Sequence, residues 1–153
     1  MFHMVDEHGS SAWAGVCDLI YLDRRDDIGY YLDQASQKGS SILEIGCSTG
    51  RITELLADFG KEVHAVDPSP EMLSIARKKI EKLTNPGQVS FSESPLPDLK
   101  LTSDRKFSLA IVPSSAFMSI LLPEDQQKFL HNVRRYLSPA GKLIIEMKVP
   151  DPD

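Results

Sequence analysis

A short apolar run that ends in a glycine-rich turn and leads into an amphipathic helix is the feature that most constrains the fold of this chain. Residues 41–45 are nearly all apolar, residues 46–50 read Gly-Cys-Ser-Thr-Gly, and the apolar positions after them recur at helical spacing. Helical patterns alternate with five such β-like runs, at 41–45, 62–66, 89–91, 107–112 and 142–147. This alternation is typical of an α/β domain with a parallel sheet.

The length of the chain fits one sheet with helices on both faces. Its 153 residues are enough for one hydrophobic core, so we expect a single domain over residues 1–153. One or two amphipathic helices are expected over about 11–38, ahead of the first strand. Crossovers between parallel neighbours are right-handed, which predicts a doubly wound, mostly parallel sheet.

Composition and charge narrow the classes of partner. With 17 Lys and Arg against 22 Asp and Glu, the net charge of −5 offers no positive field to nucleic acid or to an anionic membrane. The apolar runs are far shorter than the roughly 20 residues that span a bilayer, and no signal-peptide pattern is present. We therefore expect a cytoplasmic protein with a small-molecule partner. Cys17 and Cys47 lack metal-ligand spacing, so no metal site is expected.

An acidic residue at the end of the second strand makes the glycine turn more informative. Asp67 follows Gly46 by about 20 residues, the position at which a carboxylate accepts hydrogen bonds from ribose hydroxyls in a doubly wound fold. The glycine turn lets a ligand approach the backbone and the N-terminus of the next helix. The two features together predict a site for a nucleoside cofactor. A nicotinamide dinucleotide is disfavoured, because its glycine pattern would need glycines where Ser48 and Arg51 stand.

The same turn also satisfies the G-x-S-x-G pattern of serine hydrolases, which leaves a remote alternative with Ser48 as nucleophile. A hydrolase triad needs a histidine on a loop after a late strand. The histidines that follow Ser48 are His64, inside an expected strand, and His131, inside an expected helix. The pattern therefore favours cofactor binding over hydrolysis.

Four segments of the chain resemble the conserved motifs of class I S-adenosylmethionine-dependent methyltransferases. They are residues 43–53, 66–73, 107–115 and 137–143, and the resemblance covers roughly residues 15–148. It implies the strand order 3-2-1-4-5, S-adenosylmethionine as cofactor, S-adenosylhomocysteine as product, and methyl transfer to an unidentified, small-molecule acceptor. No residue is marked by its spacing as a catalytic base.

The resemblance also implies which residues bind the cofactor. Ser48 stands at the usual place of the middle glycine and fits there if its φ is negative. The charge of Glu44 suits a cationic ligand, although a buried acid that orients the loop backbone is an equal alternative. The implied cofactor-binding residues are Glu44, Gly46, Cys47, Ser48, Gly50, Arg51, Asp67, Pro68, Met72, Ser94, Pro95, Leu96, Pro113, Ser114 and Tyr21.

The residues after the fifth strand bear on activity and association. Family members continue with a helix and an antiparallel hairpin, whereas only residues 148–153 follow Met147, so a form truncated after the fifth strand is expected. Its open edge predicts a homodimer or larger oligomer. A catalytically silent cofactor-binding or interaction module is the alternative function.

Overall fold

A computed structural model describes residues 11–20, 26–38, 41–102 and 104–149 and confirms the doubly wound parallel sheet. The strands lie in the order β3-β2-β1-β4-β5, and every neighbouring pair is parallel. This is the order 3-2-1-4-5 that the resemblance implies. The strands are β1 (Ser41–Ile45), β2 (Glu62–Asp67), β3 (Val89–Glu93), β4 (Phe107–Val112) and β5 (Leu137–Ile145).

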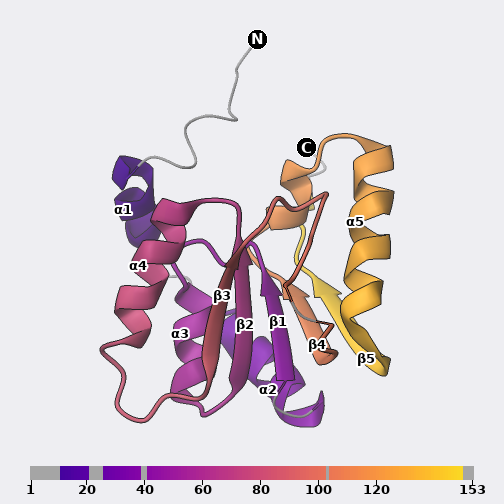
Figure 1. Ribbon diagram of the computed structural model, residues 1–153. Coiled ribbons are helices and arrows are strands. Elements are labelled where there is room, and N and C mark those ends of the chain that lie inside the picture. The colour runs from indigo at the N-terminus through magenta and orange to yellow at the C-terminus, as the bar shows by residue number, and fades with distance from the viewer. Residues whose placement is uncertain (1–10, 21–25, 39–40, 103, 150–153) are drawn as a thin grey trace.

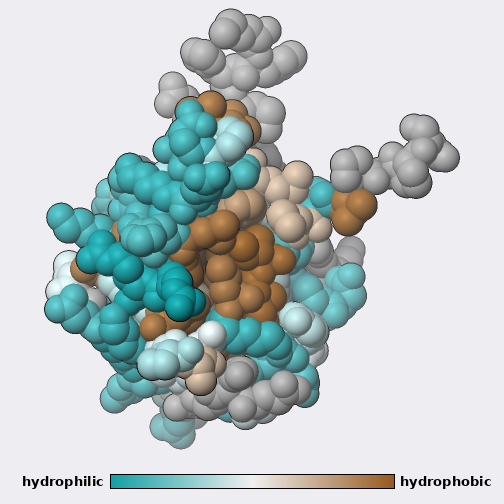
Figure 2. Space-filling view, turned by 90° about the vertical axis from the view of Figure 1, so that its right-hand side faces the viewer, coloured by the Kyte–Doolittle hydropathy of each residue, from teal (hydrophilic) through white to brown (hydrophobic). Residues whose placement is uncertain are grey.

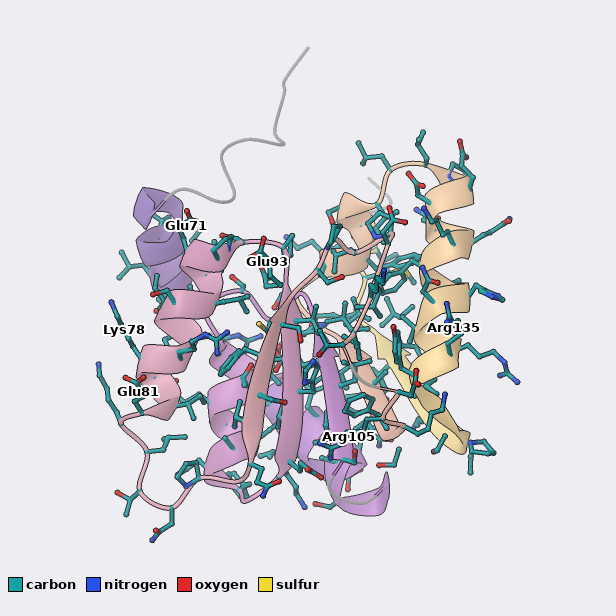
Figure 3. The ribbon with its side chains drawn as sticks, in the orientation of Figure 1. Glu71, Lys78, Glu81, Glu93, Arg105 and Arg135 are labelled. Carbon is teal, nitrogen blue, oxygen red and sulfur yellow. The ribbon has the colours of Figure 1, made fainter. Side chains whose placement is uncertain are left out.

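Helices cover both faces of the sheet, and α1 and η1 lie at the end where the strands finish (Figure 1). Two of the helices fall in the N-terminal range 11–38, where one or two were expected. Charged side chains such as Lys78 and Glu81, at the end of α4, and Arg135, on α5, point away from the sheet (Figure 3). The helices are α1 (Ser11–Ile20), α2 (Ile28–Lys38), α3 (Arg51–Asp58), α4 (Pro70–Ile80), α5 (Pro123–Tyr136) and the 3₁₀ helix η1 (Ala116–Ser119).

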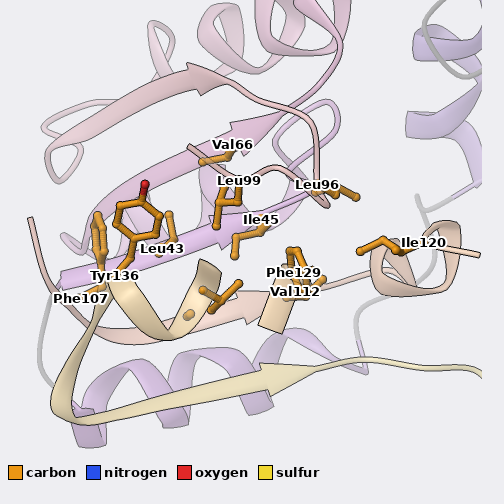
Figure 4. Close-up of a cluster of buried hydrophobic side chains, with 12 residues drawn as sticks. Leu43, Ile45, Val66, Leu96, Leu99, Phe107, Val112, Ile120, Phe129 and Tyr136 are labelled. Atoms are coloured by element: carbon orange, nitrogen blue, oxygen red, sulfur yellow. The ribbon is translucent and has the colours of Figure 1, made fainter. Parts of the chain in front are cut away.

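Two hydrophobic clusters bury the two faces of the sheet, because successive strand residues point to opposite sides. On one face, Leu43 and Ile45 of β1 pack with Phe129 and Val133 of α5 (Figure 4). On the other face, Ile42 belongs to the cluster formed with α2, α3 and α4. These two clusters bury the faces of the sheet, whereas the loops at the carboxyl ends of the strands line a cavity.

The start of α4 is set by its local sequence. Ser69 is the N-cap, and its hydroxyl accepts the Met72 N–H at 3.3 Å. Pro70 occupies the first turn, where its missing N–H costs nothing. The short spacing between β2 and α4 therefore places Asp67 and Ser69 side by side.

Some sequence predictions were wrong in detail. β5 begins at Leu137 rather than at 142, because residues 137–141 continue alongside β4 through a register shift near Phe107, and it ends at Ile145. Phe59 was expected on the buried stripe of its helix but is 62% exposed, because α3 ends at Asp58.

Candidate functional site

A cavity of about 700 Å³ lies at the carboxyl ends of β1, β2 and β4. Its walls come from the loops after these strands, with α1 on one side. Ligands of open α/β sheets bind in this place, where the strand order reverses between β1 and β4. The position of the cavity follows from the topology of the sheet.

The turn after β1 has an unusual backbone. Gly46, Ser48 and Gly50 all have positive φ, of 78°, 52° and 79°. Ser48 therefore does not meet the condition of a negative φ under which a serine fits easily in place of the middle glycine, and a left-handed serine stores about 1–3 kcal/mol of strain. The N–H groups of Gly46 and Cys47 both donate to the Val66 carbonyl, at 2.8 and 3.0 Å, which ties the turn to β2.

Asp67 is held by two backbone donors at the edge of the cavity. The Ser48 N–H donates to its Oδ2 at 2.8 Å, and the Ser69 N–H donates to its Oδ1 at 2.9 Å. Burial raises the pKa of the carboxyl group, and the two N–H donors oppose that rise. Each oxygen has a second lone pair, so the carboxylate can accept two more hydrogen bonds from a ligand in the cavity.

Glu44 lies deeper in the wall and is completely buried. Its Oε2 accepts the Thr53 hydroxyl at 2.6 Å, whereas Oε1 has no hydrogen-bond partner among the described residues. Burial raises the pKa of Glu44 to about 8, so the carboxyl group is mostly neutral at pH 7. Its hydrogen bond within the described chain goes to the Thr53 side chain of α3.

A hydrogen-bonded chain of side chains supports the wall between β1 and β4. The two terminal guanidinium nitrogens of Arg51 donate to the two carboxylate oxygens of Asp27, at 3.0 and 2.5 Å. One of these nitrogens also donates to the Ser114 hydroxyl at 3.4 Å. Glu146 accepts the Ser114 N–H at 3.0 Å and the Tyr31 hydroxyl at 2.9 Å, and burial together with this carboxylate raises the pKa of Tyr31. Arg51 is thus occupied by Asp27 rather than directed at a ligand.

Two consecutive serines after β4 have left-handed backbones. Ser114 and Ser115 have φ values of 54° and 62°, and both line the cavity. The Ser115 Oγ is buried without a hydrogen-bond partner among the described residues. Strained backbone and an unpaired polar atom are features of ligand sites, because the ligand supplies what the fold leaves out.

One residue joins α1 to the cavity wall. Asp18 accepts the Thr49 hydroxyl at 2.5 Å and Lys79 Nζ at 2.7 Å. The neighbouring Cys17 is buried and also lines the cavity. No local feature of the sequence indicates this contact, because it links segments far apart in the chain.

Most of the residues implied by the resemblance meet in this cavity. Gly50, Ser94 and Pro95 do not line it: Gly50 faces Ala76 on α4, and Ser94 turns its hydroxyl to its own loop. Tyr21 lies outside the described residues. The implied residues that do line the cavity are Glu44, Gly46, Cys47, Ser48, Arg51, Asp67, Pro68, Met72, Leu96, Pro113 and Ser114.

The prediction missed several further lining residues. Phe117 and Met118, in the loop after β4, were expected either as apolar walls of the site or as core. Neither lines the cavity: Phe117 packs against the core, as the second alternative has it, and Met118 is exposed. The position after a strand end could have indicated the loop residues after β2, but nothing local indicated the segment after β5. The N-terminal helices, the turn of residues 46–50 and the loop of residues 114–118 were expected to line a site, and the lining residues from these segments include Cys17, Asp18, Ile20, Thr49, Ser115 and Ala116. The missed residues are Ile52, Ser69, Pro70, Glu71, Ser119 and Lys148.

The geometry gives no support to the hydrolase alternative. The Ser48 hydroxyl contacts Met72 Sδ at 3.5 Å, and no histidine in the described ranges lines the cavity. Both ring nitrogens of His64 are hydrogen-bonded to serines of β3. Among the described residues there is also no cluster of possible metal ligands, and no helix long and apolar enough to cross a membrane.

Comparison with known proteins shows that the sequence is similar to methyltransferases. A family model described as "Methyltransferase domain" matches residues 42–141. An uncharacterized methyltransferase of Schizosaccharomyces pombe is 28% identical over 132 residues, covering 84% of this chain and 45% of that protein. The carboxy-S-adenosyl-L-methionine synthase of Yersinia enterocolitica is 29% identical over 125 residues, covering 79% of this chain and 45% of that protein.

The fold of this chain is also similar to that of a solved methyltransferase structure. An S-adenosylmethionine-dependent methyltransferase from Clostridium acetobutylicum superimposes with a TM-score of 0.69 and 25% identity, covering 88% of this chain and 55% of that one. The chain spans about half the length of the curated relatives that it matches.

Proposed function

Since the chain belongs to the class I S-adenosylmethionine-dependent methyltransferases, we propose that it binds S-adenosylmethionine and transfers the methyl group to a small-molecule acceptor. The observation that carries the proposal is the position of Asp67. Its two oxygens are fixed by N–H groups from the turn after β1 and the loop after β2, at the edge of one cavity. Such a carboxylate is prepared to accept both ribose hydroxyls.

The cavity suggests how the rest of the cofactor lies. The turn of residues 46–50 would face the methionine end, where positive-φ residues let the ligand approach the backbone. Pro68, Met72 and Leu96 offer apolar surface for the adenine. Pro113 and Ser114, on the loop after β4, would lie on the side of the transferred methyl group.

The proposed reaction needs orientation more than special catalytic groups. A lone pair of the acceptor attacks the methyl carbon, the carbon–sulfur bond breaks, and its electrons neutralise the sulfonium to give S-adenosylhomocysteine. Fixed alignment of the acceptor and the methyl group supplies much of the acceleration in such a displacement. The supported wall formed by Arg51, Ser114 and Glu146 is suited to hold that alignment.

The net charge and the two cysteines support the proposed class of acceptor and a cytoplasmic location. A net charge of −5 suits a small-molecule acceptor better than a nucleic acid. Cys17 and Cys47 are buried free thiols, which suits the reducing cytoplasm. We also propose that residues 1–153 act as one cofactor-binding domain and that the chain forms a homodimer or larger oligomer.

Titration calorimetry with S-adenosylmethionine, S-adenosylhomocysteine and NAD tests the cofactor. We expect binding of the first two and a clear preference for them over NAD. The Asp67→Ala variant should lose about 1–3 kcal/mol of binding free energy, through lost charge-assisted hydrogen bonds.

Asp58→Asn, which removes a carboxylate at the exposed end of α3, is the matched control and should bind normally. Unchanged affinity in Asp67→Ala would contradict the assignment of the ribose site. A preference for NAD would contradict the proposed cofactor.

A further inference from the structure

The carboxylate of Glu146 joins three elements behind the wall of the cavity. Glu146 follows β5, and its N–H donates to the carbonyl of Val112, at the end of β4, at 3.0 Å. Its side chain reaches the loop after β4, where Oε2 accepts the Ser114 N–H at 3.0 Å. The same oxygen accepts the hydroxyl of Tyr31, which lies on α2, at 2.9 Å. Segments from β5, β4 and α2 therefore meet at one oxygen atom.

Apolar surroundings make these hydrogen bonds important. Glu146 follows Ile145 and precedes Met147 in the chain. Figure 2 shows the side of the molecule on which β5 lies, with a continuous hydrophobic surface bordered by polar side chains. A carboxylate in apolar surroundings is costly unless donors satisfy it. The bonds from Ser114 and Tyr31 therefore hold the carboxylate in place.

The loop of residues 113–116, to which Glu146 is bound, has a strained backbone. Ser114 and Ser115 have φ values of 54° and 62°, in the left-handed region that serine rarely adopts. The Ser115 hydroxyl is also buried without a partner among the described residues. Such a conformation persists only where the surrounding structure enforces it. The bond from the Ser114 N–H to Glu146 is a contact of this kind.

The same loop forms part of the cavity wall. Residues 113–116 all line the cavity, whereas Glu146 does not. A Cβ placed on Gly46 would lie 2.6 Å from the Cβ of Ala116, so the loop lies directly against the turn after β1. The conformation of the loop therefore sets the shape of the cavity at the ends of β1 and β4.

The order of the strands indicates which part of a ligand this loop meets. β1 lies between β2 and β4. In the proposed function the ribose hydroxyls lie on Asp67, at the end of β2, so the cofactor must extend across the end of β1 to reach the loop. The loop then meets the part of S-adenosylmethionine beyond the ribose, which ends in the amino-acid group.

We propose that Glu146 is a positioning residue for this part of the cofactor. Its carboxylate holds Ser114 in the left-handed conformation, and the loop then presents the wall against which the amino-acid end binds. Tyr31 holds the carboxylate from α2. The proposal rests on the proposed cofactor and goes beyond it, because it gives a role to a residue behind the cavity wall.

Two ligands of different length test the proposal on the 153-residue chain. S-adenosylhomocysteine extends across β1, whereas adenosine carries the ribose hydroxyls without the amino-acid end. Glu146→Ala should weaken S-adenosylhomocysteine binding about tenfold in titration calorimetry, because the binding conformation of the loop is then populated in only a small fraction of molecules. The affinity for adenosine, measured by NMR titration, should stay unchanged.

Two further variants separate positioning from a general loss of structure. Glu146→Gln keeps a carbonyl oxygen that can accept both hydrogen bonds, so it should bind S-adenosylhomocysteine within about twofold of the wild type. Glu62→Ala, the matched control, removes a partly exposed carboxylate that pairs with Arg105 at the start of β2, and it should bind both ligands normally. Circular dichroism checks that each variant is folded.

Hydrogen exchange of the Ser114 amide, resolved by NMR, gives a readout without any ligand. The amide should be protected in the wild type and in Glu146→Gln, and should exchange about tenfold faster in Glu146→Ala. A wild type that binds neither ligand would contradict the proposed cofactor, and the positioning role with it. If the wild type binds S-adenosylhomocysteine, three results would overturn the positioning role alone: normal affinity in Glu146→Ala, an equal loss for adenosine, or a Glu146→Gln variant as weak as Glu146→Ala.

Discussion

At the scale of single residues, the two acids of the cavity show how environment decides the chemistry of a carboxyl group. Asp67 receives two backbone N–H bonds, whereas Glu44 receives one hydroxyl bond and leaves Oε1 without a partner in the described chain. The sequence indicated both positions, because each lies in or at the end of a predicted strand. It could not indicate that Glu44 is neutral, since that depends on complete burial by residues far away in the chain.

Glu44 should make the stability of the protein depend on pH. Its pKa is raised from 4.5 to about 8 in the folded state, so between these pH values the folded chain keeps a proton that the unfolded chain has released. The associated stability is fully present below pH 4.5 and is lost as pH rises toward 8, by roughly 1.4 kcal/mol per pH unit. Glu44→Gln should remove this loss, as measured by urea unfolding from pH 5 to pH 8.

Glu81→Gln, at the exposed end of α4, is the control and should follow the wild-type pH dependence (Figure 3). Because other groups titrate too, the measured quantity is the difference between variant and wild type. Parallel stability curves for Glu44→Gln and wild type would show that Glu44 is ionised in the folded protein.

At the scale of elements, local sequence predicts where each helix, strand and turn lies better than it predicts the contacts between them. The glycine turn, the N-cap Ser69 and the start of α5 at Pro123 follow from nearest-neighbour rules, and the structure confirms them. The early start of β5 was missed because it depends on pairing with β4 through an irregular register. The N-terminal helices were expected to line the site, but the ion pair of Asp18 with Lys79 was missed because it links residues far apart in the chain.

Gly50 should show that the turn after β1 and α4 are packed as a unit. Its φ is 79°, and a Cβ at this position would lie 2.8 Å from the Cβ of Ala76. Gly60 has a similar φ of 70° but open space around it. Alanine at either position costs about 1–2 kcal/mol of backbone strain, and at Gly50 we expect a further 1–3 kcal/mol, roughly, from overpacking.

Urea unfolding of Gly50→Ala and Gly60→Ala measures the difference, with Gly60→Ala as the matched control for strain alone. Equal losses of stability in the two variants would mean that α4 moves aside without cost.

At the scale of the whole molecule, topology explains why the position of the site can be predicted from the sequence although its contacts cannot. Parallel strands joined by right-handed crossovers bring all their carboxyl ends to one edge of the sheet, so the loops after β1, β2 and β4 had to converge there. An uncovered edge at the fifth strand was also expected, and Leu143, Ile144 and Ile145 are only partly buried among the described residues.

The proposed homodimer or larger oligomer should make thermal stability depend on protein concentration. Unfolding of a dimer releases two chains, so dilution favours the unfolded state by mass action. For chains of this size, we expect the Tm to rise by about 1–3 °C for each tenfold increase in concentration. Scanning calorimetry over a hundredfold range measures this, and Lys78→Glu, on the exposed face of α4, should leave the dependence intact. A Tm that stays constant for the wild type would show that the folded unit is a single chain, whatever apolar surface β5 exposes.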